Sequence, residues 1–284
     1  MLLQEHLRIA GLAHLRPKLA RSLRPFTCRS WRMKITLITV CFNSHAHIGD
    51  ALASVDQQTH PDIEHLVVDG ASTDGTQDIV RANPKPWREL ISERDDGIYD
   101  AMNKGIRRAE GEVIGFINSD DVLAHRDVLQ RVAEVFDDPN IDACFGDLCY
   151  VKRDDVDKII RYWRSSPYEL GSFERGWCPP HPTLYIRRRL YQELGGFDLR
   201  YRIAADWELM ARFVAVHRIR TNYIPEVLVK MRMGGTTNRS LANIWQQNRE
   251  IWQALNALGL HPSLLAFAVG KILSRGAQFV ARPN

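Results

Sequence analysis

The sequence lacks several features that would have identified the class of protein at once. No apolar run approaches the roughly 20 residues that a membrane-spanning helix needs. Glu5, His6 and Arg8 interrupt the early leucines, so the chain does not begin with a clean secretory signal. No strand is followed by the glycine-rich loops that bind mononucleotides or dinucleotides. The five cysteines have no zinc-type spacing, which predicts reduced, mostly buried thiols and a cytosolic setting.

A net positive charge is confined to the first segment of the chain. The net charge of the 284 residues is +4. Residues 1–32 contain seven Arg or Lys and one Glu, so the remainder has a net charge of −2. A body of this charge excludes a general nucleic-acid binder, which would carry a basic face.

Residues 1–32 form a basic extension with regularly placed leucines. This composition is typical of an amphipathic helix that lies on an anionic membrane. It is equally compatible with a disordered tail. A third interpretation is a start assigned too early, because Met33 directly precedes an apolar strand pattern and would serve as the true start.

The following residues alternate between short apolar runs and helical patterns. Hydrophobic residues make up 45% of the chain and charged residues 25%, as in ordinary globular proteins. The alternation predicts right-handed βαβ units and a mostly parallel sheet, which is an α/β fold. The predicted strands of this half are Lys34–Phe42, Glu64–Val68, Leu90–Ile91 and Val113–Ile117. Helices are predicted from Ile48, with Ile79 and Val80 on a buried face, over Tyr99–Ala109 and over Asp127–Phe136.

Two adjacent acids end the strand that begins at Val113. Asp120 and Asp121 cannot continue a buried strand, because an unpaired buried charge costs several kcal/mol. Their position is the carboxyl edge of the sheet, where open α/β sheets bind ligands. Adjacent carboxylates there suit a hard divalent cation with a bound phosphate. The alternative is a solvated turn that caps the next helix.

Two further positions carry the same ambiguity. Asp69 ends the second strand and is followed by glycines that let a ligand approach the backbone, although a polar turn is an equal alternative. Asn103 and Lys104 are polar positions on the helix beside the acid pair. A lysine there would offset the charge of a diphosphate, unless the two residues simply form a solvated helix face.

The second half of the chain is less regular. Strands are predicted at Ile141–Phe145, Thr183–Ile186 and Pro225–Met231, with strand-like pairing around a turn at Asp154. A helix is predicted to begin near Asp206, which is a candidate N-cap. Residues 241–284 are predicted to be two amphipathic helices, either packed on the core or lying at a membrane interface.

Seven ordered segments resemble glycosyltransferase family 2, most closely its bacterial exopolysaccharide and colanic-acid type. Each segment is weak alone, but the ordered set over residues 34–240 is specific. The segments are Ile38–Asn43, Val67–Thr76, Asp96–Gly105, Asn118–Asp121, His181, Ala205–Glu208 and Met233–Thr237.

The resemblance implies a GT-A fold for residues 33–240, a nucleotide-sugar donor and inversion at the anomeric carbon. It places Val40, Phe42, Asn43 and Asp69 at the nucleotide, with Asn103, Lys104, Asn118 and Asp120 also on the donor side. It assigns Mn²⁺ or Mg²⁺ to Asp120 and Asp121, with Asp121 favoured as the direct ligand. It makes Asp206 the general base and puts His181 beside the acceptor. The sequence departs from the family pattern at Asn118, where Asp is commoner, and at Pro182, where Gln is frequent.

The residues are consistent with such a reaction without the family name. A sugar on a nucleoside diphosphate has a good leaving group once a cation neutralises it, and one carboxylate can deprotonate the acceptor hydroxyl. A glycoside hydrolase would need two opposed carboxylates, and a nucleotidyltransferase a basic glycine-rich loop. A non-catalytic nucleotide-sugar-binding subunit of a polysaccharide assembly complex is the remaining alternative.

The predicted donor is a UDP- or GDP-sugar, and the predicted acceptor is a lipid-linked saccharide. We predict that the protein is attached peripherally to the cytoplasmic face of the inner membrane.

Overall fold

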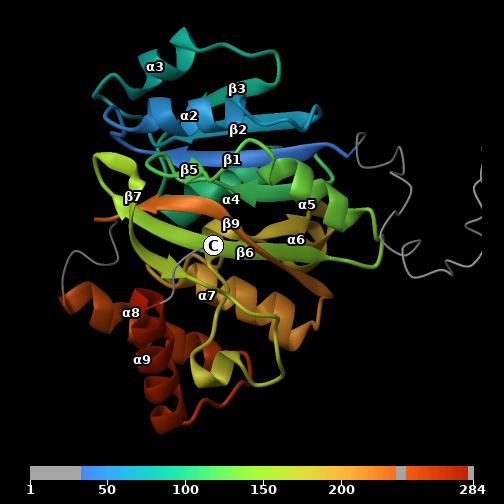
Figure 1. Cartoon of the computed structure of the whole chain (residues 1–284), viewed down its shortest axis with the longest axis vertical. Helices are drawn as coiled ribbons and strands as arrows, with labels where there is room; N and C mark the ends of the chain where they lie inside the picture. The colour runs from blue at the N-terminus through green and yellow to red at the C-terminus, as the bar shows by residue number, and fades with distance from the viewer. Residues whose placement is uncertain (1–32, 235–240, 281–284) are drawn as a thin grey trace, which may run out of the picture.

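The computed structural model describes residues 33–234 and 241–280. The described residues form one curved mixed sheet with helices on both faces (Figure 1). The strand order is β3-β2-β1-β4-β8-β6-β9-β5, and β7 pairs with β6 at the side. The predicted basic extension 1–32 and residues 235–237 of the last family segment lie outside the described residues.

The first half is a parallel βαβ arrangement, as the alternation of apolar runs predicts. Strands β1 to β4 are all parallel to one another. Every residue of β1 is buried, which explains its uninterrupted apolar and threonine sequence. The elements are β1 Ile35–Cys41, α2 Ile48–Asp56, β2 Ile63–Asp69, α3 Thr76–Ala82, β3 Arg88–Ser92, α4 Ile98–Arg108, β4 Val113–Phe116 and α5 Val128–Phe136.

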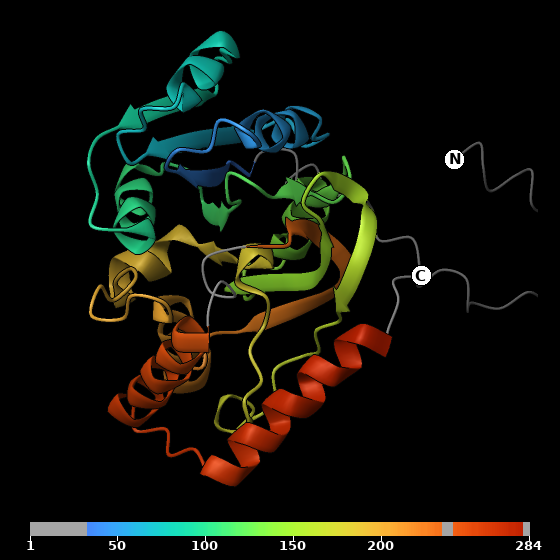
Figure 2. The same cartoon turned by 90° about the vertical axis from the view of Figure 1, so that its left-hand side faces the viewer.

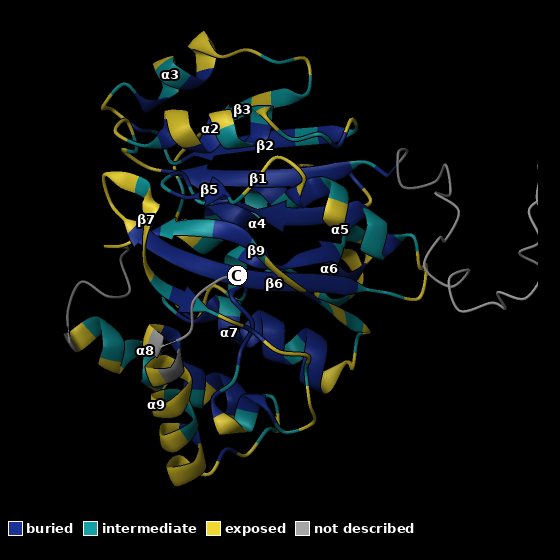
Figure 3. Cartoon of the chain, viewed as in Figure 1, coloured by how far each residue is buried: buried dark blue, intermediate teal, exposed yellow. Residues whose placement is uncertain are grey.

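Alternate residues of the parallel strands pack on opposite faces of the sheet. Ile38 and Val40 of β1 share a core with Met102 of α4. Leu37 of β1 instead packs with Val132 of α5. The sheet is therefore covered on both sides and largely buried, as Figure 3 shows. The two-residue alternation of side chains decides which face each helix covers.

The second half adds antiparallel strands to the parallel core. β8 pairs antiparallel with both β4 and β6, while β9 runs parallel to β6 and antiparallel to β5. A helical segment follows β8, and another helix continues into a π-helical turn. The elements are β5 Val122–Leu123, β6 Ala143–Lys152, β7 Asp155–Trp163, η3 Phe173–Arg175, η4 His181–Thr183, β8 Tyr185–Arg187, α6 Arg188–Leu194, α7 Ala205–Met210, η5 Ala211–Val216 and β9 Thr221–Arg232.

Two long helices, α8 Leu241–Ala257 and α9 Leu264–Val280, complete the described chain. They lie at one end of the molecule, and α9 extends along its edge (Figure 2). Ile251 and Leu255 of α8 belong to the same core as β1 and α4. A Cβ at Gly270 of α9 would lie 1.9 Å from the Arg175 carbonyl oxygen, so only glycine allows this close approach. The C-terminal helices are thus part of the main body.

None of the helices in residues 33–234 and 241–280 is both long and apolar enough to cross a membrane. Cys41, Cys144, Cys149 and Cys178 are free and buried, as the cysteine spacing predicts. The α/β class and the mostly parallel central sheet predicted from the sequence are confirmed.

Candidate active site

The carboxyl ends of β1, β2 and β3 lie side by side. Cys41 is paired with Asp69, and Asp69 with Ser92. Asp69 is fully buried, and both of its carboxylate oxygens accept hydrogen bonds. Oδ2 accepts from the Ser72 amide at 3.0 Å and from the Ser92 hydroxyl at 2.8 Å, while Oδ1 accepts from the Ser72 hydroxyl. Asp69 therefore holds the turn after β2 in shape.

The loop after β1 is fixed to the two neighbouring turns. Asn43 has a left-handed backbone with φ of 49°, which is uncommon for a residue other than glycine. Its amide donates to the Ser72 hydroxyl at 2.8 Å, and its side-chain oxygen accepts from the Thr73 amide at 3.0 Å. The hydroxyls of Ser44 and Ser119 are 2.8 Å apart, which joins this loop to the end of β4. The strained loop is therefore held by several bonds.

An exposed aromatic surface lies at the same edge of the sheet. The Phe42 side chain is 64% exposed directly after β1. A Cβ at Gly70 would lie 2.4 Å from the Asp95 carboxylate and 3.4 Å from the Phe42 ring. Glycine thus lets Phe42 and Asp95 come together over the turn after β2. A flat ring with an adjacent carboxylate suits a planar heterocycle that carries N–H donors.

The two acids after β4 have different environments. Asp121 is fully buried and accepts hydrogen bonds from the Asn118 side-chain amide at 2.9 Å and the Arg232 backbone amide at 3.1 Å. Burial and the charge of Asp120 raise the pKa of the Asp121 carboxyl. Asp120 is half-buried, and none of the residues that the structure describes donates a hydrogen bond to its carboxylate. Asp120, rather than Asp121, is the acid with a side chain open to a ligand.

Arg232, the last residue of β9, holds the acid motif from the strand that pairs with β5. Its guanidinium donates to the Asp120 carbonyl oxygen at 2.7 Å and to the Asp50 carboxylate at 2.6 Å. It also donates to the Arg153 carbonyl oxygen at 2.8 Å. Arg232 is 5% exposed. This buried cation offsets part of the repulsion between the two adjacent acids.

Asp206 lies in the first turn of α7 and does not cap it. The residue at the N-cap is Ala204, which makes no side-chain capping bond, so the N-cap interpretation of Asp206 is wrong. Glu250 of α8 accepts hydrogen bonds from the Ile203 and Ala204 amides instead, at 2.8 and 3.1 Å. Asp206 Oδ1 lies 3.1 Å from the Tyr99 hydroxyl and accepts from the Trp207 amide at 2.9 Å. No described residue bonds its Oδ2, which leaves one oxygen open.

An aromatic cluster connects Asp206 with the end of β4. The His181 ring packs against Phe116, the last residue of β4, and against Phe197, with both ring centres 5.5 Å away. Phe197 in turn stacks on Tyr99 at 5.3 Å, and Tyr99 contacts Asp206. Burial lowers the pKa of His181, against the nearby charge of Asp206. His181 and Asp206 are thus connected through Phe197 and Tyr99, and their place on the acceptor side stays a prediction.

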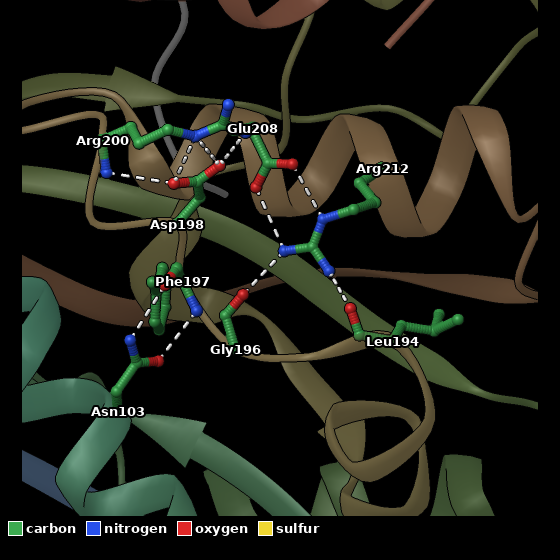
Figure 4. Close-up of polar contacts among 8 residues, drawn as sticks. All are labelled: Asn103, Leu194, Gly196, Phe197, Asp198, Arg200, Glu208 and Arg212. Atoms are coloured by element: carbon green, nitrogen blue, oxygen red, sulfur yellow. Dashed lines mark hydrogen bonds and ion pairs between the residues drawn. The ribbon is translucent and has the colours of Figure 1, made fainter. Parts of the chain in front are cut away.

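Three of the predicted donor-side residues have their side chains committed inside the protein. Asn103 exchanges two hydrogen bonds with the backbone of Phe197, at 2.8 and 2.9 Å (Figure 4). Lys104 forms ion pairs with Glu93 at 3.0 Å and Asp100 at 3.6 Å. The Val40 side chain is buried in the core. Donor contacts by these residues stay predictions, and of the three only Asn103 connects α4 to the Phe197 loop.

The Phe197 loop is also held from the helix that carries Asp206. Glu208 and Arg212 form a buried ion pair at 2.8 Å, and Arg212 donates to the carbonyl oxygens of Leu194 and Gly196 (Figure 4). Asp198 and Arg200 pair on the exposed side of the loop at 2.6 Å. Glu208 is two residues after Asp206, which is about 200° around the helix axis. Its side chain therefore points in a different direction from that of Asp206.

Sequence reasoning missed several residues of this region. Tyr99 and Asp95 lie in or beside the Asp96–Gly105 segment, which was the available signal. Arg232 and Glu250 carried no signal, because their partners are 112 and 47 residues away. Within the described residues there is no cluster of three or more His, Cys, Asp or Glu side chains that could hold a metal. A cation here would depend on Asp120 and on oxygens supplied by its ligand.

Comparison with known proteins agrees with this geometry. The family model described as glycosyl transferase family 2 matches residues 36–196. A PGL/p-HBAD biosynthesis glycosyltransferase of Mycobacterium tuberculosis is 32% identical over 210 residues, covering 72% of this chain and 78% of the relative. An uncharacterized glycosyltransferase of Nostoc sp. is 29% identical over 222 residues, covering 74% of this chain and 68% of the relative. The chain belongs to glycosyltransferase family 2, and it is a glycosyltransferase with the GT-A fold.

Solved structures share the fold at low sequence identity. The S. aureus TarS 1–349 complex with UDP-GlcNAc superposes with a TM-score of 0.61 at 20% identity, covering 87% of this chain and 72% of that one. A second TarS structure gives a TM-score of 0.58, and the matched region covers 79% of this chain but only 40% of that one. The mannosyltransferase PcManGT of Pyrobaculum calidifontis, in complex with GDP-Man and Mn²⁺, gives 0.56 at 24% identity, with 87% and 80% covered. The GT-A fold predicted from the resemblance is confirmed.

Proposed function

We propose that this enzyme transfers a sugar from a nucleoside-diphosphate donor to an acceptor hydroxyl, with inversion at the anomeric carbon. The observation that carries the proposal is that an aromatic cluster connects two open carboxylates, one after the strand β4 and one on the helix α7. Asp120 follows β4, and Asp206 is connected to the same strand end through Tyr99, Phe197 and Phe116. Fold neighbours with UDP-GlcNAc or GDP-Man support a donor of this class.

On the donor side, the Phe42 ring and the Asp95 carboxylate receive the base. Asn43 and Asp69 shape the loop and turn around it. Asp120 contributes the protein carboxylate for a Mn²⁺ or Mg²⁺ ion, which neutralises charge on the departing diphosphate when bound. The side chains of Asn118 and Asp121 are bonded to one another and so hold the turn that contains Asp120. The sequence favoured Asp121 as the direct ligand. Asp120 is preferred instead, because Asp121 is fully buried.

On the acceptor side, Asp206 acts as the general base. The acceptor oxygen forms a bond to the anomeric carbon while the bond from that carbon to the diphosphate oxygen breaks. The proton of the acceptor hydroxyl moves to the open Oδ2 of Asp206, and the nucleoside diphosphate leaves as an anion. Tyr99 holds the other carboxylate oxygen, so the base is oriented before the acceptor binds. His181 and Phe197 form an apolar wall beside it.

The acceptor is proposed to be a lipid-linked saccharide at the cytoplasmic face of the membrane. The support is the exposed apolar surface of α9, where Leu264, Leu265 and Ile272 are 70% or more exposed. An amphipathic helix with such a surface is suited to lie on a bilayer without crossing it. The basic extension 1–32, which the sequence analysis also associates with a membrane, lies outside the described residues.

The metal assignment is tested by changing the two acids separately. Asp120→Asn is expected to lower Mn²⁺-dependent hydrolysis of a UDP- or GDP-sugar by 100-fold or more with an unchanged melting temperature, because metal stabilisation is worth several kcal/mol. Asp121→Asn is expected to lower the melting temperature, since its amide would face the Arg232 and Asn118 N–H donors. Asp154→Asn, in the exposed turn before β7, is the control. Full Mn²⁺-dependent activity of Asp120→Asn would reject the assignment.

A further inference from the structure

An apolar groove of the described surface lies between α8 and α9, at the end of the molecule opposite to α2 and α3 (Figure 1). Its volume is about 440 Å³, which is in the range of small-molecule sites. The groove is open to solvent along its length, and its lining is almost wholly apolar except for three cations and one amide. The lining residues are Trp245, Asn248, Arg249, Trp252, Leu264, Phe267, Ala268, Lys271, Ile272 and Arg275.

The cations of this groove have no acidic partner among the described residues. Lys271 Nζ donates to the Asn248 side-chain oxygen at 2.8 Å and lies over the rings of Trp207 and Phe267 at 5.2 and 5.1 Å. Arg249 lies over the Trp245 ring at 5.6 Å. Glu250, the one acid in the described part of these helices, is bonded to the start of α7. An apolar groove with unpaired cations favours an amphiphilic anion.

The inner end of the groove reaches the helix that carries the proposed base. Trp207, whose ring faces Lys271, directly follows Asp206 in α7. The charge of Asp206 is close enough to act on Lys271. Phe267 of α9 also packs on Trp207, with the ring centres 6.1 Å apart. A ligand in the groove would therefore present its charged end toward the acceptor side of the active site.

The outer end of the groove opens on the exposed face of α9. Figures 2 and 3 show this helix along the edge of the molecule, with most of its surface exposed. Its exposed apolar residues are Leu264, Leu265, Val269, Ile272, Leu273 and Phe279, with Trp245 of α8 beside them. An exposed patch of this kind marks a site for a lipid or a partner. A hydrocarbon chain could pass from this face into the groove without crossing polar surface.

We propose that the groove between α8 and α9 binds the phosphate and the first hydrocarbon segment of the lipid-linked acceptor. Lys271 contacts the phosphate at the inner end, with Arg275 and Arg249 along the entrance, while Trp252 and Phe267 line the path of the chain. The saccharide then extends past Trp207 toward Asp206. This inference rests on the proposed function and identifies the chemical class of its acceptor. A plain bilayer contact would not account for Lys271, whose side chain lies inside the groove among aromatic rings.

Protonation of Lys271 gives the binding a pH dependence. Burial and the charge of Arg275 lower the pKa of Lys271 to about 8, while Cys178 and Asp206 oppose this shift. Arg249 and Asn248 face it from α8. Below pH 8 the lysine is charged and attracts a phosphate, and above pH 8 the free protein loses that charge. Binding of a phosphate lipid is therefore expected to weaken as the pH rises from 7 to 9.

The test measures binding of farnesyl phosphate to the full chain through the fluorescence of its tryptophans. Farnesol and inorganic phosphate are the matched probes that lack one half of the ligand. Farnesyl phosphate is expected to bind at least 10-fold more tightly than either.

The variants test which residues make the contacts. Lys271→Met is expected to weaken the binding of farnesyl phosphate about 10-fold or more and to leave the binding of farnesol unchanged. Lys85→Met, at a surface ion pair on the other side of the sheet, is the control. Trp245→Ser, at a 65% exposed position, tests the apolar contact with little risk to folding.

The other outcomes overturn the inference. Equal binding of farnesyl phosphate and farnesol, or no effect of Lys271→Met, means that no phosphate is bound at Lys271. If vesicles of phosphatidylglycerol bind with the same dependence on Lys271 and displace farnesyl phosphate, the groove is a general membrane contact. Hydrolysis of the sugar nucleotide separates this result from the proposed function. Wild-type donor hydrolysis without selective binding of farnesyl phosphate would reject the groove alone, whereas absence of donor hydrolysis in the wild type would reject the proposed function itself.

Discussion

At the scale of single residues, the site depends on which carboxylate oxygens are already bonded. Asp69 and Asp121 are fully buried and bonded on both sides, so they serve as supports. Asp120 and Asp206 each keep an oxygen to which no described residue donates. An unsatisfied carboxylate at a site edge is available for a ligand, because a bonded one must first lose its partners at a cost of about 1–3 kcal/mol each.

Tyr99 is the residue whose removal should reveal how the base is oriented. Its hydroxyl lies 3.1 Å from both Asp206 Oδ1 and the Ile203 carbonyl oxygen, and its ring stacks on Phe197. Tyr99→Phe keeps the ring and removes the bond, which for a charged acceptor is worth roughly 1.5–3 kcal/mol. We expect kcat to fall roughly 10- to 100-fold, while the KM for the donor and the melting temperature stay close to wild type.

Steady-state kinetics with a saturating donor distinguishes this orienting role from a packing role. Tyr201→Phe, which removes a hydroxyl from another buried tyrosine near α7, is the matched control. Turnover of Tyr99→Phe within twofold of the wild type would show that the contact with Asp206 does not orient the base.

Sequence reasoning could select candidate residues but could not predict the surroundings of their side chains. The buried strand before Asp120 and Asp121 marked these two acids as candidates, while Asp206 and His181 were candidates through the family resemblance. These signals could not predict that Asp121 is enclosed and Asp120 open, because this depends on Arg232, which is 112 residues from Asp120. For the same reason, the internal partner of Asn103, the Phe197 backbone, could not be foreseen.

At the scale of elements, the parallel strands contain a buried histidine that ties them together. His65 of β2 lies 2.9 Å from the Thr39 hydroxyl of β1 and accepts from Arg88 of β3 at 3.1 Å. Burial and the charge of Arg88 lower its pKa to about 3. The neutral ring thus serves as a hydrogen-bonded spacer between three strands.

This histidine should make the sheet sensitive to acid. The unfolded chain takes up a proton near pH 6.5 while the folded chain resists it until about pH 3, so stability is expected to fall as the pH drops through this window. Urea unfolding at pH 7 and pH 5 measures the loss. His65→Leu is expected to be less stable at pH 7, because Thr39 and Arg88 lose a partner, but to lose less between the two pH values. An equal loss in both proteins would contradict the account.

Elements with strong periodicity were predictable, and elements defined by distant pairing were not. The strands β1, β2 and β4 and the helices α2, α4 and α5 follow the sequence patterns within about two residues. The strand β5 is only Val122–Leu123 and exists because it pairs with β9. β9 itself begins at Thr221, before the predicted Pro225, since its register is set by β6.

At the scale of the whole molecule, the active site joins two halves of the chain. The proposed donor side comes from the parallel strands, while the proposed base comes from α7, whose start is held by Glu250 of α8. The C-terminal helices therefore support the helix of the proposed base and also form the proposed acceptor groove. The sequence predicted these helices but left open whether they pack on the core or face a membrane. Figure 1 places α8 against the body, and α9 keeps an exposed apolar face.

The central claim is that Asp206 of the second half deprotonates an acceptor hydroxyl, which then attacks a donor bound by the first half. The most direct measurement compares kcat for transfer with donor affinity in Asp206→Asn, which keeps the shape of the side chain. Loss of a general base typically costs 10² to 10⁴ in rate, roughly 3–5 kcal/mol. We predict that kcat falls by this factor while the donor dissociation constant and melting temperature remain near wild type. An Asp206→Asn enzyme that retains most of its turnover would contradict the account.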